Sequence, residues 1–204
     1  MNARSARQFI LFFILSLECT PYAQSYSPGQ EVVPPCNAAQ FKRVQRDAAR
    51  GLAIAQTALA DSYANGRCVA QSYAQAALWY RRAAEQGNAD AQYELAMYLV
   101  EGKEVTLDEK DAAKWFARAA EQNHSQAQYA LGVLYVQGRG LPKDIVQGYA
   151  WIRISSPSPD RHTQDVLAEL AKSMSRGDID RAEAAAASWM TAHPGNHSQD
   201  SPKK

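Results

Sequence analysis

Residues 91–115 read AQYELAMYLVEGKEVTLDEKDAAKW, and the register of this stretch recurs 36 residues before it and 36 residues after it. The shared positions carry an Ala-Gln pair, a Leu, a Gly and a Trp. In the three copies they are Ala55-Gln56, Ala91-Gln92 and Ala127-Gln128; Leu59, Leu95 and Leu131; Gly66, Gly102 and Gly138; and Trp79, Trp115 and Trp151. A fixed period of this length indicates a solenoid of stacked units. Because such units present extended surfaces, the period favours binding over catalysis.

Each copy predicts two helices, an A helix followed by a B helix. We expect A helices at 53–65, 89–101 and 125–137, and B helices at 73–86, 108–122 and 143–155. A glycine follows each expected A helix, at Gly66, Gly102 and Gly138, where a left-handed C-cap favours glycine. No run of alternating β-branched residues competes with the helical period, so we expect an all-α fold.

The three copies, at 53–88, 89–124 and 125–156, are flanked by further helical segments. Residues 38–50 align with the end of a B helix and predict an N-terminal capping helix. Pro157 interrupts the third B helix, and residues 161–191 then predict a C-terminal cap of two helices, near 161–174 and 178–191. Terminal units of a solenoid are atypical because one side faces water. The predicted solenoid therefore occupies residues 37–192.

The first residues are typical of a secretory signal peptide. Arg4 and Arg7 precede an apolar run at residues 9–17, which is far shorter than the ~20 residues that a membrane helix needs. We expect cleavage after Ala23 or after Ser25, which predicts a periplasmic or secreted chain with no stable membrane span once the signal is removed.

Two alternatives to simple secretion stay open: a lipid anchor at Cys19 and an uncleaved N-terminal anchor. With residues 1–23 as the signal peptide, residues 24–36 form a leader whose prolines and glycine oppose a helix. Residues 193–204 are a polar tail that we expect to be disordered.

The charge and the motifs argue against several classes of function. The formal net charge is +1 and no Lys/Arg-rich run stands out, so the footprint of a nucleic-acid-binding protein is absent. No Gly-x-Ser-x-Gly, His-Glu-x-x-His or P-loop motif occurs. His193 and His197 are separated by Pro194 and Gly195, so no helix presents them together to a metal. We therefore expect no enzyme, no catalytic residue, no metal and no cofactor.

The register resembles the Sel1-like repeat. Its pattern, Ala-Gln-x-x-Leu-(Ala/Gly)-x-x-(Tyr/Leu)-x-x-Gly and then Ala-Ala-x-Trp-(Tyr/Phe)-x-Arg-Ala-Ala-Glu-Gln, is carried by residues 55–87 and 91–123, with a third copy at 127–156. The resemblance implies a right-handed α/α solenoid related to tetratricopeptide repeats. It also implies a non-enzymatic scaffold or adaptor that holds a protein or peptide partner.

Two narrower likenesses supply alternatives. Cys36, the Cys68-Val69 pair and the segment 160–163, Asp-Arg-His-Thr, resemble the MotX-type flagellar motor proteins. That likeness implies a periplasmic role in stator assembly and a partner in the envelope or the flagellar motor. Some cysteine-rich Sel1-like proteins are linked to weak β-lactam binding, which implies a cell-wall-related role as the other alternative.

Cys36 and Cys68 are expected to form a disulfide. Cys36 precedes the predicted capping helix and Cys68 follows the first A helix, and antiparallel helices place the start of one beside the end of the next. An even number of cysteines in an oxidising compartment also favours pairing. The bond would close a loop of about 32 residues and stabilise the fold by roughly 3–4 kcal/mol. Free thiols are one alternative, and a catalytic thiol, for which no Cys-x-x-Cys spacing is present, is the other.

The A helices carry the candidate binding residues. On a helical wheel of about 100° per residue, the positions two before and two after the core leucine lie opposite the core. They are Tyr93 with Met97, and Tyr129 with Val133, and a polar rim is expected from Asn65, Glu101 and Gln137. The resemblance places this stripe on the concave face, where aromatic and Met side chains suit an apolar anchor of a partner. The other interpretation is that these side chains pack between neighbouring A helices.

The three repeated tryptophans are predicted to lie in the core.

Overall fold

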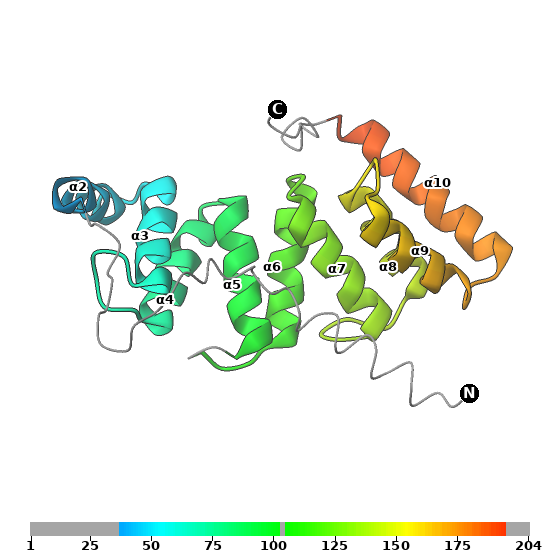
Figure 1. Cartoon of the computed structure of the whole chain (residues 1–204), viewed down its shortest axis with the longest axis horizontal. Coiled ribbons are helices and arrows are strands. Elements are labelled where there is room, and N and C mark those ends of the chain that lie inside the picture. The colour runs from blue at the N-terminus through cyan, green and yellow to red at the C-terminus, as the bar shows by residue number, and fades with distance from the viewer. Residues whose placement is uncertain (1–36, 103–104, 195–204) are drawn as a thin grey trace, which may run out of the picture. The chain divides into compact units, whose positions relative to one another are not determined.

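The computed structural model of the chain describes residues 37–102 and 105–194, and all regular elements in these ranges are α-helices (Figure 1). In chain order they are α2 (Ala38–Ala49), α3 (Ala53–Asn65), α4 (Tyr73–Glu85), α5 (Ala89–Glu101), α6 (Glu109–Glu121), α7 (Ser125–Gln137), α8 (Ile145–Ser155), α9 (Arg161–Ala171) and α10 (Arg176–Ala192). The all-α prediction is confirmed. The predicted signal peptide, the leader to residue 36 and the tail from residue 195 lie outside the described residues.

The A helices of the repeats, α3, α5 and α7, end in the predicted way. Gly66, Gly102 and Gly138 each adopt a left-handed backbone, with φ of 64°, 65° and 69°. The B helices α6 and α8 begin one or two residues later than the sequence predicts, because Asp108 and Asp144 stand before the first turn as N-caps. The Asp144 carboxylate accepts hydrogen bonds from two backbone N–H groups at 3.0 Å, which satisfies donors that the helix itself leaves unpaired.

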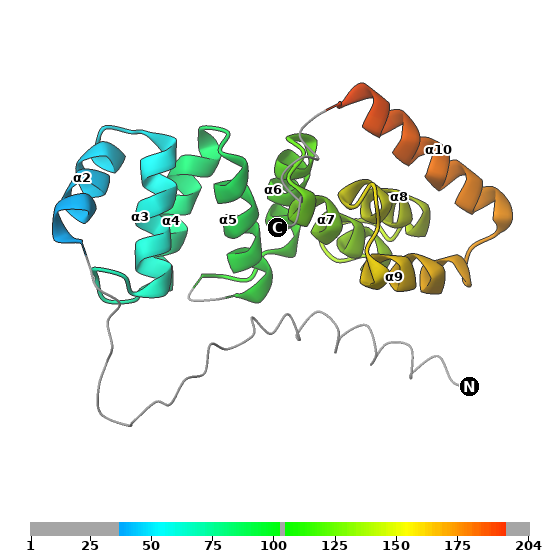
Figure 2. The same cartoon turned by 45° about the horizontal axis from the view of Figure 1, so that its top comes forward.

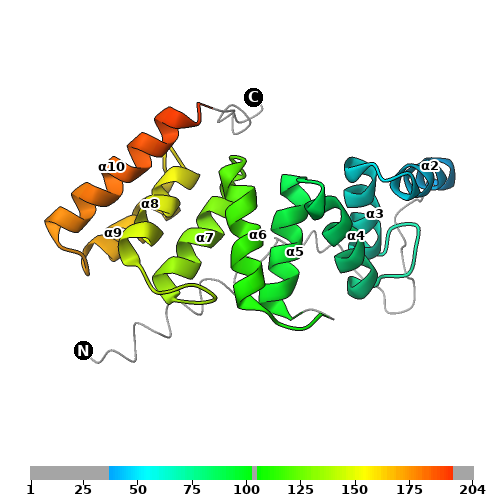
Figure 3. The same ribbon diagram turned by 180° about the vertical axis from the view of Figure 1, so that it is seen from behind.

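Successive helices pack as a ladder of neighbours. Within each repeat, α3 packs on α4, α5 on α6 and α7 on α8, while α2 with α3, α4 with α5 and α6 with α7 join one unit to the next (Figure 3). The contact surfaces are rich in alanine. Fully buried alanines of the repeats are Ala60, Ala76, Ala83, Ala91, Ala96, Ala112, Ala119, Ala120 and Ala127. Each unit thus buries its apolar face only with its neighbours, as in other solenoids.

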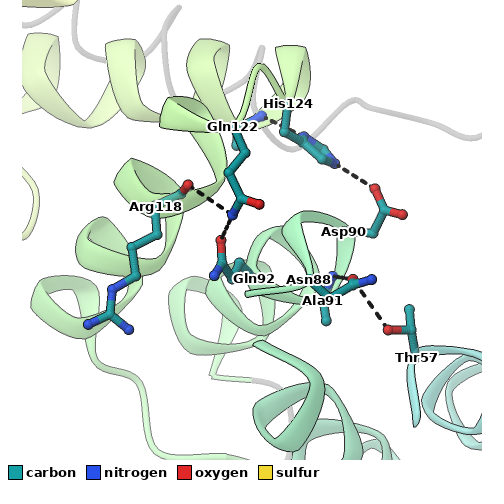
Figure 4. A network of polar contacts seen from close by, with 9 residues as sticks. Thr57, Asn88, Asp90, Ala91, Gln92, Arg118, Gln122 and His124 are labelled. Atoms are coloured by element: carbon teal, nitrogen blue, oxygen red, sulfur yellow. Dashed lines mark hydrogen bonds and ion pairs between the residues drawn. The ribbon is translucent and has the colours of Figure 1, made fainter. Parts of the chain in front are cut away.

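The buried glutamine of each repeat ties an A helix to the B helix before it. The side-chain amides of Gln56, Gln92 and Gln128 donate to the carbonyls of Ala48, Ala84 and Ala120 at 3.3, 3.1 and 3.1 Å. Gln92 also accepts a hydrogen bond at 2.8 Å from Gln122 (Figure 4), and Gln56 accepts one at 2.6 Å from Gln86. A buried amide is stabilising only when it is paired, which explains why the Ala-Gln pair recurs.

The C-terminal end differs from a repeat. Pro157 follows the end of α8 at Ser155, and the A-like helix α9 buries only Thr163 and Leu167. The last helix, α10, contacts α8 (Figure 2) and buries Ala182 and Ala186. Its Trp189 ring meets the Trp151 ring edge-on at 5.7 Å. The second apolar cluster of the protein therefore lies between α8 and the two capping helices.

The tryptophan prediction needs a correction. Trp115 is buried, but Trp79 and Trp151 are only half-buried. The guanidinium groups of Arg82 and Arg118 lie 4.4 and 4.6 Å from the ring centres of Trp79 and Trp115. Because the B-helix tryptophan sits at the edge of the core, one ring face is left for a cation one turn later on the same helix.

Candidate binding site

A cavity of about 400 Å³ opens among α3, α4 and α5. Four of the residues predicted from sequence line it: Asn65, Tyr93, Met97 and Glu101. The structure thus brings together predicted residues from two consecutive A helices. Ligand pockets typically span roughly 300–1,000 Å³, so this cavity has room for one or two side chains of a partner.

Helical spacing explains which side chains reach the cavity. From α3 come Asp61, Ala64 and Asn65, which lie three and four residues apart on one face. From α5 come Tyr93, Glu94, Met97, Tyr98 and Glu101, again one stripe. Tyr73 and Tyr80, two turns apart on α4, and Gln71 before that helix complete the lining.

Hydrogen bonds fix the α3 side of the cavity. The Tyr80 hydroxyl donates to Asp61 Oδ1 at 2.6 Å, and the Asn65 amide donates to the Asp61 carbonyl at 2.8 Å. The Gln71 amide donates to the Ala64 carbonyl at 2.8 Å and to the Tyr73 hydroxyl at 3.0 Å. The lining is therefore ordered before any partner arrives, which lowers the entropic cost of binding.

The aromatic rings at the cavity belong to two groups of packed rings. Tyr98 meets Tyr73 and Tyr80 edge-on, with ring centres 6.0 and 5.6 Å apart. Tyr93 stacks on the His124 imidazole at 4.8 Å and leans on Phe116 at 5.8 Å. These spacings are those of favourable aromatic pairs. Part of Tyr93 is thus committed to packing against α6 and the start of α7, and its role in binding stays a prediction.

Among the described residues that line the cavity, the charged side chains are acidic. Asp61, Glu94 and Glu101 are its ionisable carboxylates, and none of the described lining residues is basic. Burial raises the pKa of the Tyr80 hydroxyl most, and the hydrogen bond to Asp61 and the charges of Asp61 and Glu94 raise it further. Burial and the nearby Glu94 and Glu101 carboxylates also raise the pKa of Tyr98. The tyrosines therefore stay protonated and neutral at physiological pH.

The other three predicted residues, all on α7, are not among those that line the cavity. The Tyr129 hydroxyl lies 3.4 Å from Nε2 of His162 on α9, and Val133 packs against the second apolar cluster. Gln137 accepts a 3.4 Å hydrogen bond from Arg139. The C-terminal cap supplies part of the surroundings of this helix, so the predicted stripe divides into two environments.

Sequence reasoning missed Asp61, Tyr73, Tyr80, Glu94 and Tyr98. The repeat itself held a signal for three of them. Thirty-six residues later, the positions of Asp61, Tyr80 and Tyr98 are Met97, Phe116 and Leu134. Polar atoms at positions that another copy fills with apolar side chains indicate a local role beyond packing.

Outside the cavity, the structure describes only one of the two cysteines that are predicted to form a disulfide. Cys68 follows α3 with a left-handed backbone, φ 66°, and the equivalent position in the third copy is Gly140, φ 68°. Such a backbone costs a non-glycine residue roughly 1–2 kcal/mol. Cys36 lies outside the described residues, so the pairing remains a prediction.

The described residues contain neither a cluster suited to a metal ion nor a helix suited to a membrane. Within residues 37–102 and 105–194, no cluster of three His, Cys, Asp or Glu side chains is arranged to hold a metal. No helix in these ranges is both long enough and apolar enough to cross a membrane.

Comparisons with known proteins identify the repeats. The family model of the Sel1 repeat matches residues 53–88, 89–124 and 125–156. A search of curated proteins finds no match. A Sel1 repeat protein from Oxalobacter formigenes, known from its crystal structure, is 31% identical with a TM-score of 0.58, covering 64% of this chain and 98% of that one. A protective antigen of uropathogenic Escherichia coli strains, displaying an SLR fold, is 27% identical with a TM-score of 0.49, covering 74% of this chain and 40% of that one. The three matched repeats span half of the sequence, and the chain belongs to the Sel1 repeat family.

Proposed function

We propose that the protein is a non-enzymatic scaffold or adaptor that binds a protein or peptide partner in the cavity among α3, α4 and α5. Sel1 repeat proteins are non-catalytic scaffolds that generally mediate protein–protein interactions. The observation that carries the proposal is the convergence of Asn65, Tyr93, Met97 and Glu101 on one ordered cavity. An aromatic ring and a flexible Met side chain at its wall are suited to receive a partner's anchor residue.

We place this activity in the periplasm or outside the cell, after cleavage near Ala23 or Ser25. The apolar run at residues 9–17 behind two arginines supports export. The left-handed Cys68 supports a Cys36–Cys68 disulfide, because a thiol retained at a position suited to glycine needs a reason other than packing. The flagellar-motor and cell-wall alternatives remain predictions from sequence.

The test is site-specific photo-crosslinking in living cells. A photoreactive phenylalanine analogue replaces Gln71, which is exposed at the cavity, and the crosslinked species is identified by mass spectrometry. The same experiment is then run on the double variant Tyr93→Ala with Met97→Ala. We expect this variant to lose the crosslinked partner.

The repeat offers a matched control. Tyr129→Ala with Val133→Ala truncates the two equivalent side chains one period later, outside the cavity lining, and should retain the crosslink. Melting temperatures of both variants are measured alongside. Equal crosslinking by both double variants, or loss of the crosslink only in proportion to loss of folded protein, would contradict a binding role for the cavity.

A further inference from the structure

The outer face of the N-terminal helix α2 carries a concentration of positive charge. Among the described elements, α2 packs against α3 (Figure 1). Lys42, Arg43, Arg46 and Arg50 are all exposed. On a wheel of about 100° per residue they fall within an arc of about 100°, opposite Ala48, which is buried. The four side chains are spaced along the sequence, and the helix gathers them on one face.

Folding alone does not explain this face. Arg46 lies three or four residues from Lys42, Arg43 and Arg50, spacings at which like charges destabilise a helix. Asp47 relieves part of the repulsion through ion pairs with Arg43 at 3.6 Å and Arg50 at 3.5 Å. The capping helices at the C-terminal end, α9 and α10, meet water with both signs instead, since together they hold three basic and five acidic residues. A terminal unit needs a polar outer face, but not one sign of charge.

Two exposed apolar side chains adjoin the basic face. In the part of the chain that the structure describes, four large apolar side chains are exposed, and two of them are Leu52 and Ile54, at 53% and 79%. Because Cα atoms two residues apart are separated by no more than about 7.6 Å, Leu52 lies next to Arg50 and Ile54 lies next to Leu52. The aliphatic pair therefore continues the surface that the basic face begins.

The other copies of the repeat show what these positions need for folding. The equivalents of the first position are Asn88 and His124, whose side chains cap α5 and α7 by accepting a hydrogen bond from the first turn. Leu52 makes no such hydrogen bond at the start of α3. Two residues on, the other copies carry Asp90 and Gln126. The first copy thus lacks a helix cap, which costs stability, and exposes two aliphatic side chains where polar ones would fold as well.

Cationic and aliphatic side chains on one surface match an anionic lipid bilayer. Lys and Arg are attracted to its headgroups, and aliphatic side chains enter its interfacial layer. A nucleic acid would pair with the charge but would leave the aliphatic pair exposed. A protein usually receives an apolar anchor in a pocket, and the cavity among α3, α4 and α5 lies towards the other end of α3, at Asp61, Ala64 and Asn65.

We propose that the outer face of α2, with Leu52 and Ile54 beside it, docks the chain on an anionic phospholipid surface. The guanidinium and ammonium groups contact the lipid phosphates, and the two aliphatic side chains enter the layer between headgroups and acyl chains. The attachment is peripheral and reversible. It uses no residue that lines the cavity, so this inference stands or falls independently of the proposed partner site.

The test is flotation of the exported chain with lipid vesicles. One set of vesicles is phosphatidylcholine, and the other is phosphatidylcholine mixed with phosphatidylglycerol. We expect binding to the anionic vesicles only, weakened at least about tenfold when NaCl is raised from about 50 to about 500 mM. Equal binding to the two kinds of vesicle, or binding to neither, would overturn the proposal.

A matched pair of variants tests the basic face. Lys42→Gln with Arg46→Gln removes two charges of α2. Arg161→Gln with Arg176→Gln removes two exposed charges from the first residues of α9 and α10. Only the α2 pair should weaken binding to anionic vesicles, by about tenfold or more. Equal effects of the two pairs would contradict docking through α2. If the α2 variant does not fold, the lipid and salt comparisons on the wild-type chain decide.

A second pair tests the aliphatic side chains. Leu52→Asn with Ile54→Gln installs residue types that the other copies carry and leaves the net charge unchanged. The new N-cap should keep α3 at least as stable, while binding to anionic vesicles should weaken at least about tenfold. Leu78→Gln with Leu107→Gln, which alters the other two exposed side chains, is the control and should bind as the wild type does.

The same variants separate a membrane from other anions. Vesicle binding that survives Leu52→Asn with Ile54→Gln unchanged would reduce the face to a site for any polyanion and overturn its assignment to lipid. A single-stranded RNA is titrated in parallel. Tighter binding of this RNA than of the anionic vesicles, lost in Lys42→Gln with Arg46→Gln, would assign the face to nucleic acid instead.

Discussion

The close approach of α7 and α8 gives a prediction that opposes the repeat pattern. Gly132 on α7 and Gly148 on α8 occupy positions that hold alanine in the other copies, at Ala96 and Ala112. From the pattern alone, Gly132→Ala should be harmless and should gain roughly 0.5–1 kcal/mol in helix propensity. The structure predicts that Gly132→Ala lowers the stability instead.

The magnitude follows from the contacts. A Cβ on Gly132 would lie 2.7 Å from Ile152 Cγ1, 2.8 Å from the Gly148 carbonyl oxygen and 3.0 Å from the Ile152 nitrogen. Two of these atoms are backbone, so a rotamer change cannot relieve the overlap and the helices must separate. Overpacking of this kind costs about 1–3 kcal/mol. After the propensity gain, we expect a net loss of about 1–2 kcal/mol, or roughly 2–8 °C in Tm for a chain of this size.

The assay is thermal and urea unfolding followed by circular dichroism. Gly177→Ala on α10 is the matched control, because its Cβ would meet nothing closer than the Ser175 hydroxyl at 4.0 Å; we expect it to be neutral or slightly stabilising. Gly148→Ala should behave like Gly132→Ala, since its Cβ would lie 2.9 Å from the Gly132 carbonyl oxygen. A Gly132→Ala chain as stable as wild type would show that α7 and α8 accommodate the added methyl group without separating.

Three further predictions concern Gln92, His124 and the pair Cys36 and Cys68. Gln92→Ala removes one buried and one partly buried hydrogen bond and should lower the free energy of unfolding in urea by about 2–3 kcal/mol; a change below about 0.5 kcal/mol would contradict a stabilising role for these hydrogen bonds. Burial lowers the pKa of His124 more than the Asp90 carboxylate raises it. The unfolded chain is therefore protonated first, and stability should fall as the pH drops below about 6.5. In the His124→Asn variant, the free energy of unfolding in urea, measured at several pH values, should fall less steeply as the pH drops. An unchanged dependence of stability on pH would show that His124 does not cause the fall. In the exported chain, alkylation without reductant should leave Cys36 and Cys68 unmodified in mass spectrometry; two modified thiols would end the disulfide idea.

Helix positions were the most predictable part of the fold, because they depend on local signals. The periods of Leu and Ala place the A helices, and Gly66, Gly102 and Gly138 end them at left-handed C-caps. The N-cap at position 88, 124 and 160 is Asn, His and Asp, and each side chain accepts a hydrogen bond from the first turn of its helix. His124 caps α7 through its Nδ1, which accepts a hydrogen bond at 3.2 Å from the Ala127 backbone N–H.

The candidate site was only partly predictable. The helical wheel identifies Tyr93 and Met97, because the residues that lie opposite a core leucine follow from the spacing within one helix. It gives no sign that the α4 side chains Tyr73 and Tyr80 reach the same space, nor that α9 brings His162 to Tyr129. Those contacts depend on how far apart and at what angle the helices cross, which the pattern within one helix does not contain.

A 36-residue period of apolar, small and capping residues is enough to predict an all-α solenoid with three repeats, because the helices can bury their apolar faces only by stacking. The period does not reveal that three carboxylates and four tyrosines from α3, α4 and α5 share a cavity. Nor does it reveal that Gly132 and Gly148 let α7 and α8 approach too closely for a Cβ. The physical reason is the same in both cases: local periodicity sets which side of a helix faces its neighbours, whereas distances between helices arise from all the side chains packed between them.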